Sequence, residues 1–485
     1  MADSRVKETH VSWVFFVADR VYKVKKPVVF PFLDWTTPEA REEACRSEVR
    51  LNRRLSPDVY LGVGHFTAPD GGREPVVVMR RLPADCSLSA LIRRGDPSLP
   101  GRMEELAAIL AAFHAQAERG PAVDRDCTPE AVSDLWRRNL VELEGNPGCR
   151  LPPAVLSEVA ELADGWLRGR EPLLESRVAD GRAVDGHGDL LCDDTFFPPD
   201  GVRVLDCLEF DPALRHGDTV ADLAALAMDI EHLGRPELAG ELIRSYQAAS
   251  GDRWPPSLTD FWISYRALVR AKVGCYRCST AAGREARAIR DDVGRLVGLA
   301  VQHLRSARIR VVLVGGLPGT GKTTLARRLG EHTGWPVLSS DALRRATAGP
   351  GPGVRTGSGY GQGIYARPCI DANYQALIRS AAERVRHGYP VILDASWSRS
   401  AWRGAAGSMA RERSAQLVAL ECVAPVDVAR GRILARKAAG DNLSDATPEV
   451  AVEMAGSYDP WPEAVKVDTS CPQADSLDRA LSALD

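Results

Sequence analysis

The sequence lacks the features of several protein classes. It contains no run of about 18 apolar residues, the length that a membrane-spanning helix needs. Residues 1–8 lack the apolar stretch of a secretory signal peptide, and no tract of Lys and Arg or stripe of aromatic and basic residues suits long nucleic acid. The 11 cysteines are odd in number and scattered, which is typical of reduced thiols. We therefore expect a cytoplasmic protein with neither a membrane nor a nucleic-acid partner, whose oligomeric state stays open.

Lysine is also scarce. Only 8 of the 62 basic residues are lysines. In a chain that otherwise uses Arg, a Lys is expected where a compact ammonium group is needed. Three of the eight crowd together as Lys23, Lys25 and Lys26, and another is Lys322.

Length and charge indicate several domains. At 485 residues, of which 45% are hydrophobic, the chain is too long for one ordinary core, and two or three domains are expected. The net charge of −3 is unevenly shared, because residues 301–485 hold 23 Lys and Arg against 18 Asp and Glu, which gives +5 and leaves −8 for residues 1–300. The C-terminal part is mildly basic, as a part that binds phosphates should be.

The most specific motif lies near residue 320. The four apolar residues 311–314 lead into a glycine-rich segment, and a helical pattern begins at Leu325. This order of strand, loop and helix predicts a phosphate-binding loop whose backbone N–H groups surround phosphate oxygens. Lys322 is expected to reach the β- and γ-phosphates, and the Thr323 hydroxyl to bind Mg²⁺. The predicted nucleotide-binding residues are Gly316, Gly319, Thr320, Gly321, Lys322, Thr323 and Thr324.

Further apolar runs alternate with helical patterns after this loop. Together with residues 311–315, the runs at 336–340, 390–394, 417–422 and 464–468 predict a five-stranded parallel sheet wrapped by helices. Asp394 ends one of these strands, where an acid would hold the water shell of Mg²⁺.

Residues 1–83 read as a small lobe. Residues 13–17 and 20–25 predict a β-hairpin, in which alternation places Lys23 and Lys25 on one face. A helix over 38–55 follows, with Thr37 as its N-cap and Glu48 in its middle. Strands are then expected at 60–63 and 75–79, and residues 84–304 form a mainly helical lobe.

Three acids in this helical lobe suit phosphoryl transfer. Asp189 lies in a tight His187-Gly-Asp turn, Asp194 follows five residues later, and Asp206 comes after a short apolar strand. Kinases need one carboxylate that takes the proton of the acceptor hydroxyl and two oxygen ligands that hold Mg²⁺ on the nucleotide phosphates.

These motifs, with His216-Gly-Asp218 and Asp222, resemble the aminoglycoside phosphotransferase family, which shares the protein-kinase-like fold. The resemblance implies that Asp189 is the catalytic base and that Asp206 and Asp194 bind Mg²⁺, Asp194 standing where the family usually has Asn. It also implies a phosphate-binding lysine, either Lys23 or Lys25, with Glu48 as its partner. Asp218 and Asp222 are expected to brace the catalytic loop, and His114 to be a core histidine. No glycine-rich loop precedes the hairpin, so a short polar lid is expected there.

The C-terminal part carries a second resemblance. Asp341-Ala-Leu-Arg344 is similar to the Asp-x-x-Arg element of small P-loop kinases of the gluconate, shikimate and polynucleotide kinase type. This implies that Asp341 takes the proton of the acceptor and that Arg344 binds the acceptor. Arg432 and Arg436 lie on one helix face and are interpreted as lid arginines or, alternatively, as a solvated surface. Residues 359–365 fit a mobile acceptor-side loop or a linker.

The whole chain therefore resembles a bacterial family that fuses an aminoglycoside phosphotransferase-like domain to a P-loop kinase. The predicted fold is an α+β protein-kinase-like domain followed, at residues 305–485, by an α/β P-loop domain. The expected activity is ATP- or GTP-dependent, Mg²⁺-dependent phosphorylation of hydroxyl groups on a small molecule at two sites. Two alternatives remain: a first domain that only binds nucleotide and regulates the second, and a P-loop domain that phosphorylates 5′-hydroxyl ends of nucleic acid. The motifs do not identify the acceptor.

Overall fold

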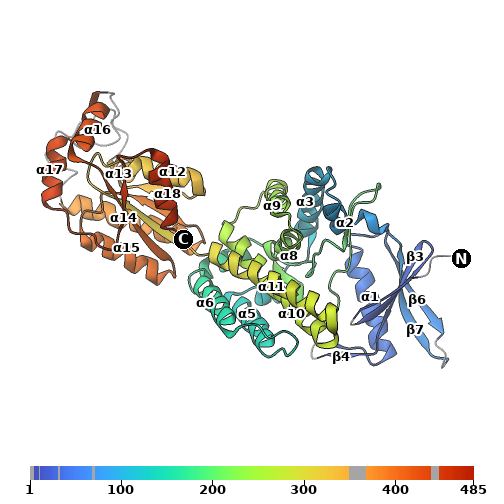
Figure 1. The fold of residues 1–485 in the computed structure, drawn as a ribbon. Coiled ribbons are helices and arrows are strands. Elements are labelled where there is room, and N and C mark those ends of the chain that lie inside the picture. The colour runs from blue at the N-terminus through green and yellow to red at the C-terminus, as the bar shows by residue number, and fades with distance from the viewer. Residues whose placement is uncertain are drawn as a thin grey trace. The chain divides into compact units, whose positions relative to one another are not determined.

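A computed structural model of the chain describes residues 5–9, 11–30, 33–67, 71–348, 367–438 and 447–484. It divides into two compact units (Figure 1). The first consists of residues 1–163, 174–254 and 258–306, and the second of residues 164–173, 255–257 and 307–485. The chain passes from the first unit to the second after Ser306, and the second also includes two short segments from the predicted helical lobe. Within the described ranges, no helix is both long and apolar enough to span a bilayer.

The first unit begins with a five-stranded antiparallel sheet in the order β1-β2-β3-β7-β6. Its strands are β1 (Arg5–Glu8), β2 (Ser12–Val17), β3 (Arg20–Lys25), β6 (Tyr60–Thr67) and β7 (Arg73–Arg80), and the short pair β4 (Val29–Phe30) and β5 (Leu33–Asp34) lies outside it. The predicted hairpin is confirmed, with Ser12 opposite Lys25. Strand β1 was not predicted because its four residues are all exposed and show no apolar alternation.

Helix α1 (Pro38–Asn52) packs against one face of this sheet. The Thr37 hydroxyl accepts a hydrogen bond from the Ala40 N–H at 3.1 Å, which confirms the predicted N-cap. Cys45 and Val49 of the helix pack against Val77 and other apolar side chains of the sheet. The face of β3 that carries Val21 and Lys23 therefore lies beneath the helix that carries Glu48.

The rest of the first unit is mainly helical, as predicted. Its helices are α2 (Leu88–Arg93), α3 (Leu99–Gln116), α4 (Pro121–Asp126), α5 (Pro129–Glu144), α6 (Pro153–Leu167), α7 (Glu171–Ala179), α8 (Thr219–His232), α9 (Pro236–Ser250), α10 (Pro256–Thr280) and α11 (Gly283–Ser306). Two short antiparallel pairs, β8 (Ala183–Asp185) with β11 (His216–Asp218) and β9 (Thr195–Phe196) with β10 (Arg203–Val204), bring the acidic motifs to neighbouring backbone segments.

The second unit contains the predicted five-stranded parallel sheet, in the order β13-β14-β12-β15-β16. The strands are β12 (Arg310–Gly315), β13 (Val337–Ser339), β14 (Val391–Asp394), β15 (Gln416–Val423) and β16 (Val465–Asp468). The helices are α12 (Lys322–Thr333), α13 (Ser340–Ala348), α14 (Arg367–Arg386), α15 (Ser400–Glu412), α16 (Val426–Ala438), α17 (Pro448–Gly456) and α18 (Gln473–Ser482). The predicted loop at 359–365 lies outside the described residues.

Both faces of this sheet are buried. Val311 and Leu313 pack with residues of α14 and α15, whereas Val312 and Val314 pack with residues of α12 and α18. A strand buried on both sides reads as a continuous apolar run, which is why residues 311–314 were recognisable as a strand.

A buried ion cluster supports the helical lobe. The guanidinium of Arg177 donates to the carboxylate of Asp218 at 2.7 Å and to that of Asp252 at 2.8 Å, and all three side chains are at least nine-tenths buried. Asp218 also caps α8 by accepting from the Val220 N–H. The cluster therefore fixes the start of the helix whose Asp222 binds the loop at Gly188.

Replacing Arg177 by Met should lower the free energy of unfolding of the intact chain by about 3–5 kcal/mol, because two buried carboxylates lose their cation. Urea unfolding at neutral pH measures this change. The matched control is Arg137→Met, whose exposed pair with Asp134 contributes little. Equal effects of the two substitutions would contradict the structural role of the cluster.

Candidate active sites

The first site is built around Glu48 of α1. One of its carboxylate oxygens lies 2.9 Å from the ammonium of Lys23, and Lys23 also reaches the carboxylate of Asp206 at 2.5 Å. Attraction to Lys23 holds the pKa of Asp206 at about 2, below its usual value. Lys23, its helix partner Glu48 and Asp206 are thus brought together from three separate segments.

Lys25 lies deeper than Lys23. Its ammonium contacts the second oxygen of Glu48 at 2.5 Å and the carboxylate of Glu209, and it stands over the Trp35 ring at 4.6 Å from the centroid. The Lys25 side chain is fully buried, whereas that of Lys23 is 13% exposed. Of the two lysines left open by the sequence, only Lys23 is accessible to a ligand.

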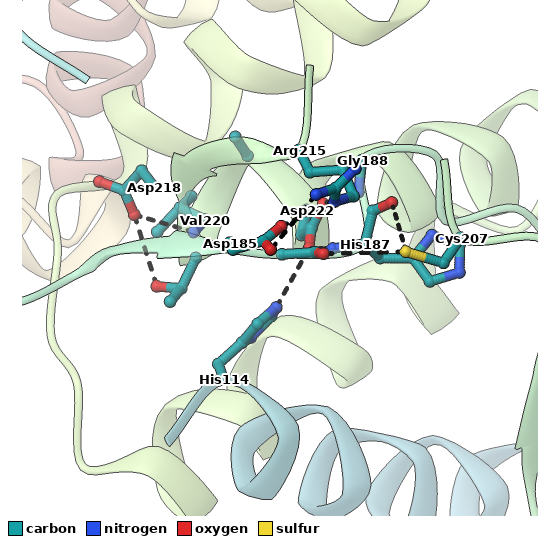
Figure 2. Close-up of polar contacts among 12 residues, drawn as sticks. His114, Asp185, His187, Gly188, Cys207, Arg215, Asp218, Val220 and Asp222 are labelled. Atoms are coloured by element: carbon teal, nitrogen blue, oxygen red, sulfur yellow. Dashed lines mark hydrogen bonds and ion pairs between the residues drawn. The ribbon is translucent and has the colours of Figure 1, made fainter. Parts of the chain in front are cut away.

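The predicted catalytic loop, which contains His187, Gly188 and Asp189, is held by Asp222 of α8. Its carboxylate accepts from the backbone N–H of His187 at 2.5 Å and of Gly188 at 2.9 Å (Figure 2). His114 lies 3.3 Å from the same carboxylate and is buried, as expected of a core histidine. A Cβ on Gly186 would overlap the Asp222 carboxylate, so only glycine fits there. Asp222 therefore braces the loop, as predicted, and His114 is the core histidine that contacts Asp222.

A second brace was missed by the sequence analysis. The guanidinium of Arg54 donates to the carbonyls of Asp185 at 2.8 Å and Gly186 at 2.7 Å, and Asn52 accepts from the Cys207 N–H at 2.9 Å. Asn52 is the last residue of α1, and Arg54 lies two residues beyond it. They tie the Glu48 helix to the segments on either side of the predicted Asp189 and Asp206 sites, and no motif marks them in a chain rich in Arg.

The side chain of Asp189 is accessible and has a cationic neighbour. It is 38% exposed, and its carboxylate lies 3.9 Å from the guanidinium of Arg270 in α10. One turn earlier, Arg266 donates to the Gly188 carbonyl at 2.7 Å. Arg266 and Arg270 are four residues apart, which indicates a common helix face. Nothing in the sequence indicates that this face contacts the Asp189 loop.

The carboxylates of this site suit a divalent cation. Burial and the charges of Asp206 and Asp189 raise the pKa of the Asp194 carboxyl well above its usual range. Such crowding of like charges is relieved by Mg²⁺, so Asp194 and Asp206 fit as its ligands. Among the described residues no group of three or more His, Cys, Asp or Glu side chains forms a metal site alone. Mg²⁺ in nucleotide sites commonly takes one or two carboxylates and completes its shell with phosphates and water.

The expected lid of this site is the β1–β2 connection. The Thr9 hydroxyl accepts from the Ser12 N–H at 2.9 Å, and Lys26 donates to the Thr9 carbonyl at 2.6 Å. The sequence has no glycine-rich loop at this position, and the structure has this polar turn instead.

The second site is the loop between β12 and α12. Gly316, Gly319 and Gly321 all have positive φ, at 136°, 83° and 83°. A Cβ on Gly319 would overlap the carbonyl of Ala429, so the loop passes directly over backbone at that point. The predicted strand, loop and helix are all present, and Lys322 is the first residue of α12. The Thr320 hydroxyl donates to the Leu317 carbonyl within the same loop, whereas Thr323 and Thr324 are exposed.

Asp394 completes this second site. The Thr323 hydroxyl donates to one carboxylate oxygen of Asp394 at 2.9 Å, while the other oxygen is buried and has no hydrogen-bond partner. Burial raises the pKa of this carboxyl. A buried oxygen without a donor, beside a hydroxyl at the loop, fits the water shell of Mg²⁺.

The predicted arginines of the second unit take different positions. Arg344 pairs with Asp341 at 2.6 Å, and both side chains are partly exposed. Arg432 donates to the Thr469 carbonyl at 2.6 Å and lies 3.5 Å from the Gly319 carbonyl. Its guanidinium therefore contacts the backbone of the glycine-rich loop and of the segment that follows β16. Arg436 is partly buried on the same helix, α16.

The two folds and their sites define a two-domain protein that joins a protein-kinase-like domain to a P-loop domain. A family model described as "AAA domain" matches residues 311–461. Protein Rv2004c of Mycobacterium tuberculosis (strain H37Rv) and protein Mb2027c of Mycobacterium bovis are each 41% identical over 481 residues, which cover 98% of this chain and 94% of each relative. The chain belongs to the same family as these mycobacterial proteins, which confirms the bacterial two-domain family expected from the motifs.

Two solved structures are similar to separate parts of the chain. A choline/ethanolamine kinase family protein from Mesorhizobium loti aligns over 63% of this chain and 93% of its own, at 14% identity and a TM-score of 0.40. A gluconokinase from Sinorhizobium meliloti 1021 aligns over 37% of this chain and 91% of its own, at 18% identity and a TM-score of 0.26.

Replacing Gly319 by Ala should weaken nucleotide binding at the second site more than tenfold, because the Cβ meets the Ala429 carbonyl and left-handed backbone costs about 1–2 kcal/mol for a residue with a side chain. Isothermal titration measures the affinity. Gly404→Ala in α15 is the control, since nothing lies within 4 Å of its added Cβ. Unchanged affinity in the Gly319 variant would contradict the tight loop.

Proposed function

We propose that the protein is an ATP- and Mg²⁺-dependent kinase with two phosphoryl-transfer sites, each acting on hydroxyl groups of small polar metabolites. The observation that carries the proposal is the same in both units: a lysine, a carboxylate suited to Mg²⁺ and an accessible proton acceptor. In the first unit these are Lys23, Asp206 and Asp189. In the second unit these are Lys322, Asp394 and Asp341.

In the first site, Lys23 would exchange its contact with Asp206 for the nucleotide phosphates, while Glu48 keeps its ammonium in place. Asp189 would accept the proton of the acceptor hydroxyl while the oxygen of that hydroxyl bonds to the γ-phosphorus. The bond between that phosphorus and the β–γ bridging oxygen breaks, and ADP leaves. Mg²⁺ held by Asp194 and Asp206 would neutralise the developing charge on the phosphate oxygens. Arg270 adds a further positive charge beside Asp189.

In the second site, the backbone N–H groups of residues 316–321 and Lys322 would bind the phosphates. Thr323 and Asp394 would hold Mg²⁺, which supplies the same charge neutralisation there. Asp341 would accept the acceptor proton while Arg344, already paired with it at 2.6 Å, binds the acceptor. Arg432 and Arg436 are proposed to close on the nucleotide from α16.

A second candidate function is supported by the polar turn at Thr9. Without a glycine-rich lid, the first unit could bind nucleotide and only regulate the second. Transfer of phosphate by a Lys322→Ala chain, in which the second site is impaired, would exclude this alternative.

The test of the proposal is ATP turnover by the full-length chain over a panel of sugars, aminoglycosides, amino alcohols and nucleosides. Removing the base with Asp189→Asn should slow first-site turnover by about 10²–10⁴-fold. Lys322→Ala should abolish second-site turnover. Asp193→Asn, at an exposed acid beside the catalytic loop, is the control for the loss of one negative charge. If no acceptor supports activity that either substitution removes, the two-site proposal is wrong.

A further inference from the structure

Beneath Lys23, the first unit contains a second ion pair that the phosphoryl-transfer roles do not use. Lys25 contacts both Glu48 and Glu209, and Glu209 follows the metal-binding Asp206 by three residues. We propose that Lys25 and Glu209 are positioning residues: a permanent anchor that holds Asp206 ready for Mg²⁺ while Lys23 exchanges partners. This inference rests on the proposed function of the first site.

The five charged side chains form one chain of contacts, in the order Asp206, Lys23, Glu48, Lys25 and Glu209. Exposure divides this chain into an outer and an inner part. Asp206 is half exposed, and Lys23 retains some exposure, so a ligand can reach both. Lys25 and Glu48 are completely buried, and Glu209 is 7% exposed, so a ligand does not reach these three side chains.

Nucleotide binding must break the outer contact. When Lys23 turns to phosphate and Asp206 turns to Mg²⁺, the attraction between them no longer holds the two segments together. The contact between Lys25 and Glu209 survives this exchange because it lies out of reach of the ligand. Breaking it would leave a charge buried without its partner, which is costly.

The backbone at Asp206 needs such an anchor. Its φ is +64°, a left-handed conformation that side-chain-bearing residues seldom adopt. On one side its N–H donates to the Tyr60 hydroxyl at 3.1 Å, and on the other the Cys207 N–H donates to Asn52. Glu209 adds a charged contact just beyond, so Lys25 helps to fix the direction of the Asp206 carboxylate.

The substitution that tests the anchor is Glu209→Gln in a full-length Lys322→Ala parent, which lacks a working second site. Glutamine keeps the shape of Glu209 and leaves Lys25 paired with Glu48. The measurement is binding of a fluorescent ADP analogue as Mg²⁺ is titrated. We expect the Mg²⁺ midpoint to rise about tenfold while metal-free nucleotide binds as in the parent, because Asp206 is displaced and Lys23 is not.

The matched control is Glu42→Gln, which removes an acid of α1 from its pairs with Arg46 and His65, outside the buried chain. Its Mg²⁺ midpoint should equal that of the parent. Thermal unfolding shows whether each variant is folded, and Glu209→Asp, which keeps the charge with a shorter reach, should give an intermediate midpoint. This second variant tests the anchor even if Glu209→Gln does not fold.

Two results would overturn the anchor alone: a parent-like Mg²⁺ midpoint in folded Glu209 variants, or equal weakening of metal-free and Mg²⁺-loaded nucleotide. The first result would mean that Asp206 needs no anchor. The second would mean that Glu209 stabilises the whole site and does not specifically orient the Asp206 carboxylate. A parent that shows no Mg²⁺-dependent nucleotide binding contradicts the proposed function of the first site itself, and the anchor with it.

Discussion

A buried carboxylate between two ammonium groups is the constraint on which the first unit depends. Glu48 is fully buried and is approached by Lys23 and Lys25, one at each oxygen. Removing charges from water costs several kcal/mol for each ion unless they are paired. The strand that carries the lysines and the helix that carries Glu48 must therefore pack in one register, and the segment of Asp206 and Glu209 must close over them. The same pairing that satisfies these charges assembles the site.

In the second unit a steric constraint takes this place. The loop passes over backbone so closely that Gly319 admits no side chain, and the apolar sheet beneath it is buried on both faces. Asp394, at the end of the neighbouring strand, accepts a hydrogen bond from the Thr323 hydroxyl beside this loop. Packing thus positions the site residues of this unit, whereas ion pairing positions those of the first.

Much of this could be predicted from the sequence. The central strands β12 and β14 were identified because strands buried on both faces are continuous apolar runs. The hairpin and the N-cap at Thr37 were identified because their patterns are local. Pairings distant in sequence were harder. That Lys23 rather than Lys25 is accessible depends on Glu209, more than 180 residues away. The roles of Arg54 and Arg270 were missed because in a chain rich in Arg no local signal separates a brace from a surface residue.

The central claim, that the chain carries two separately built nucleotide sites, is tested most directly by binding stoichiometry. Isothermal titration of the full-length protein with an ATP analogue in excess Mg²⁺ should show two nucleotides bound per chain. Lys322→Ala should leave one, Lys23→Met should leave the other, and the double variant should bind none. A single nucleotide in the unaltered chain, or two that disappear together on either substitution, would contradict the account.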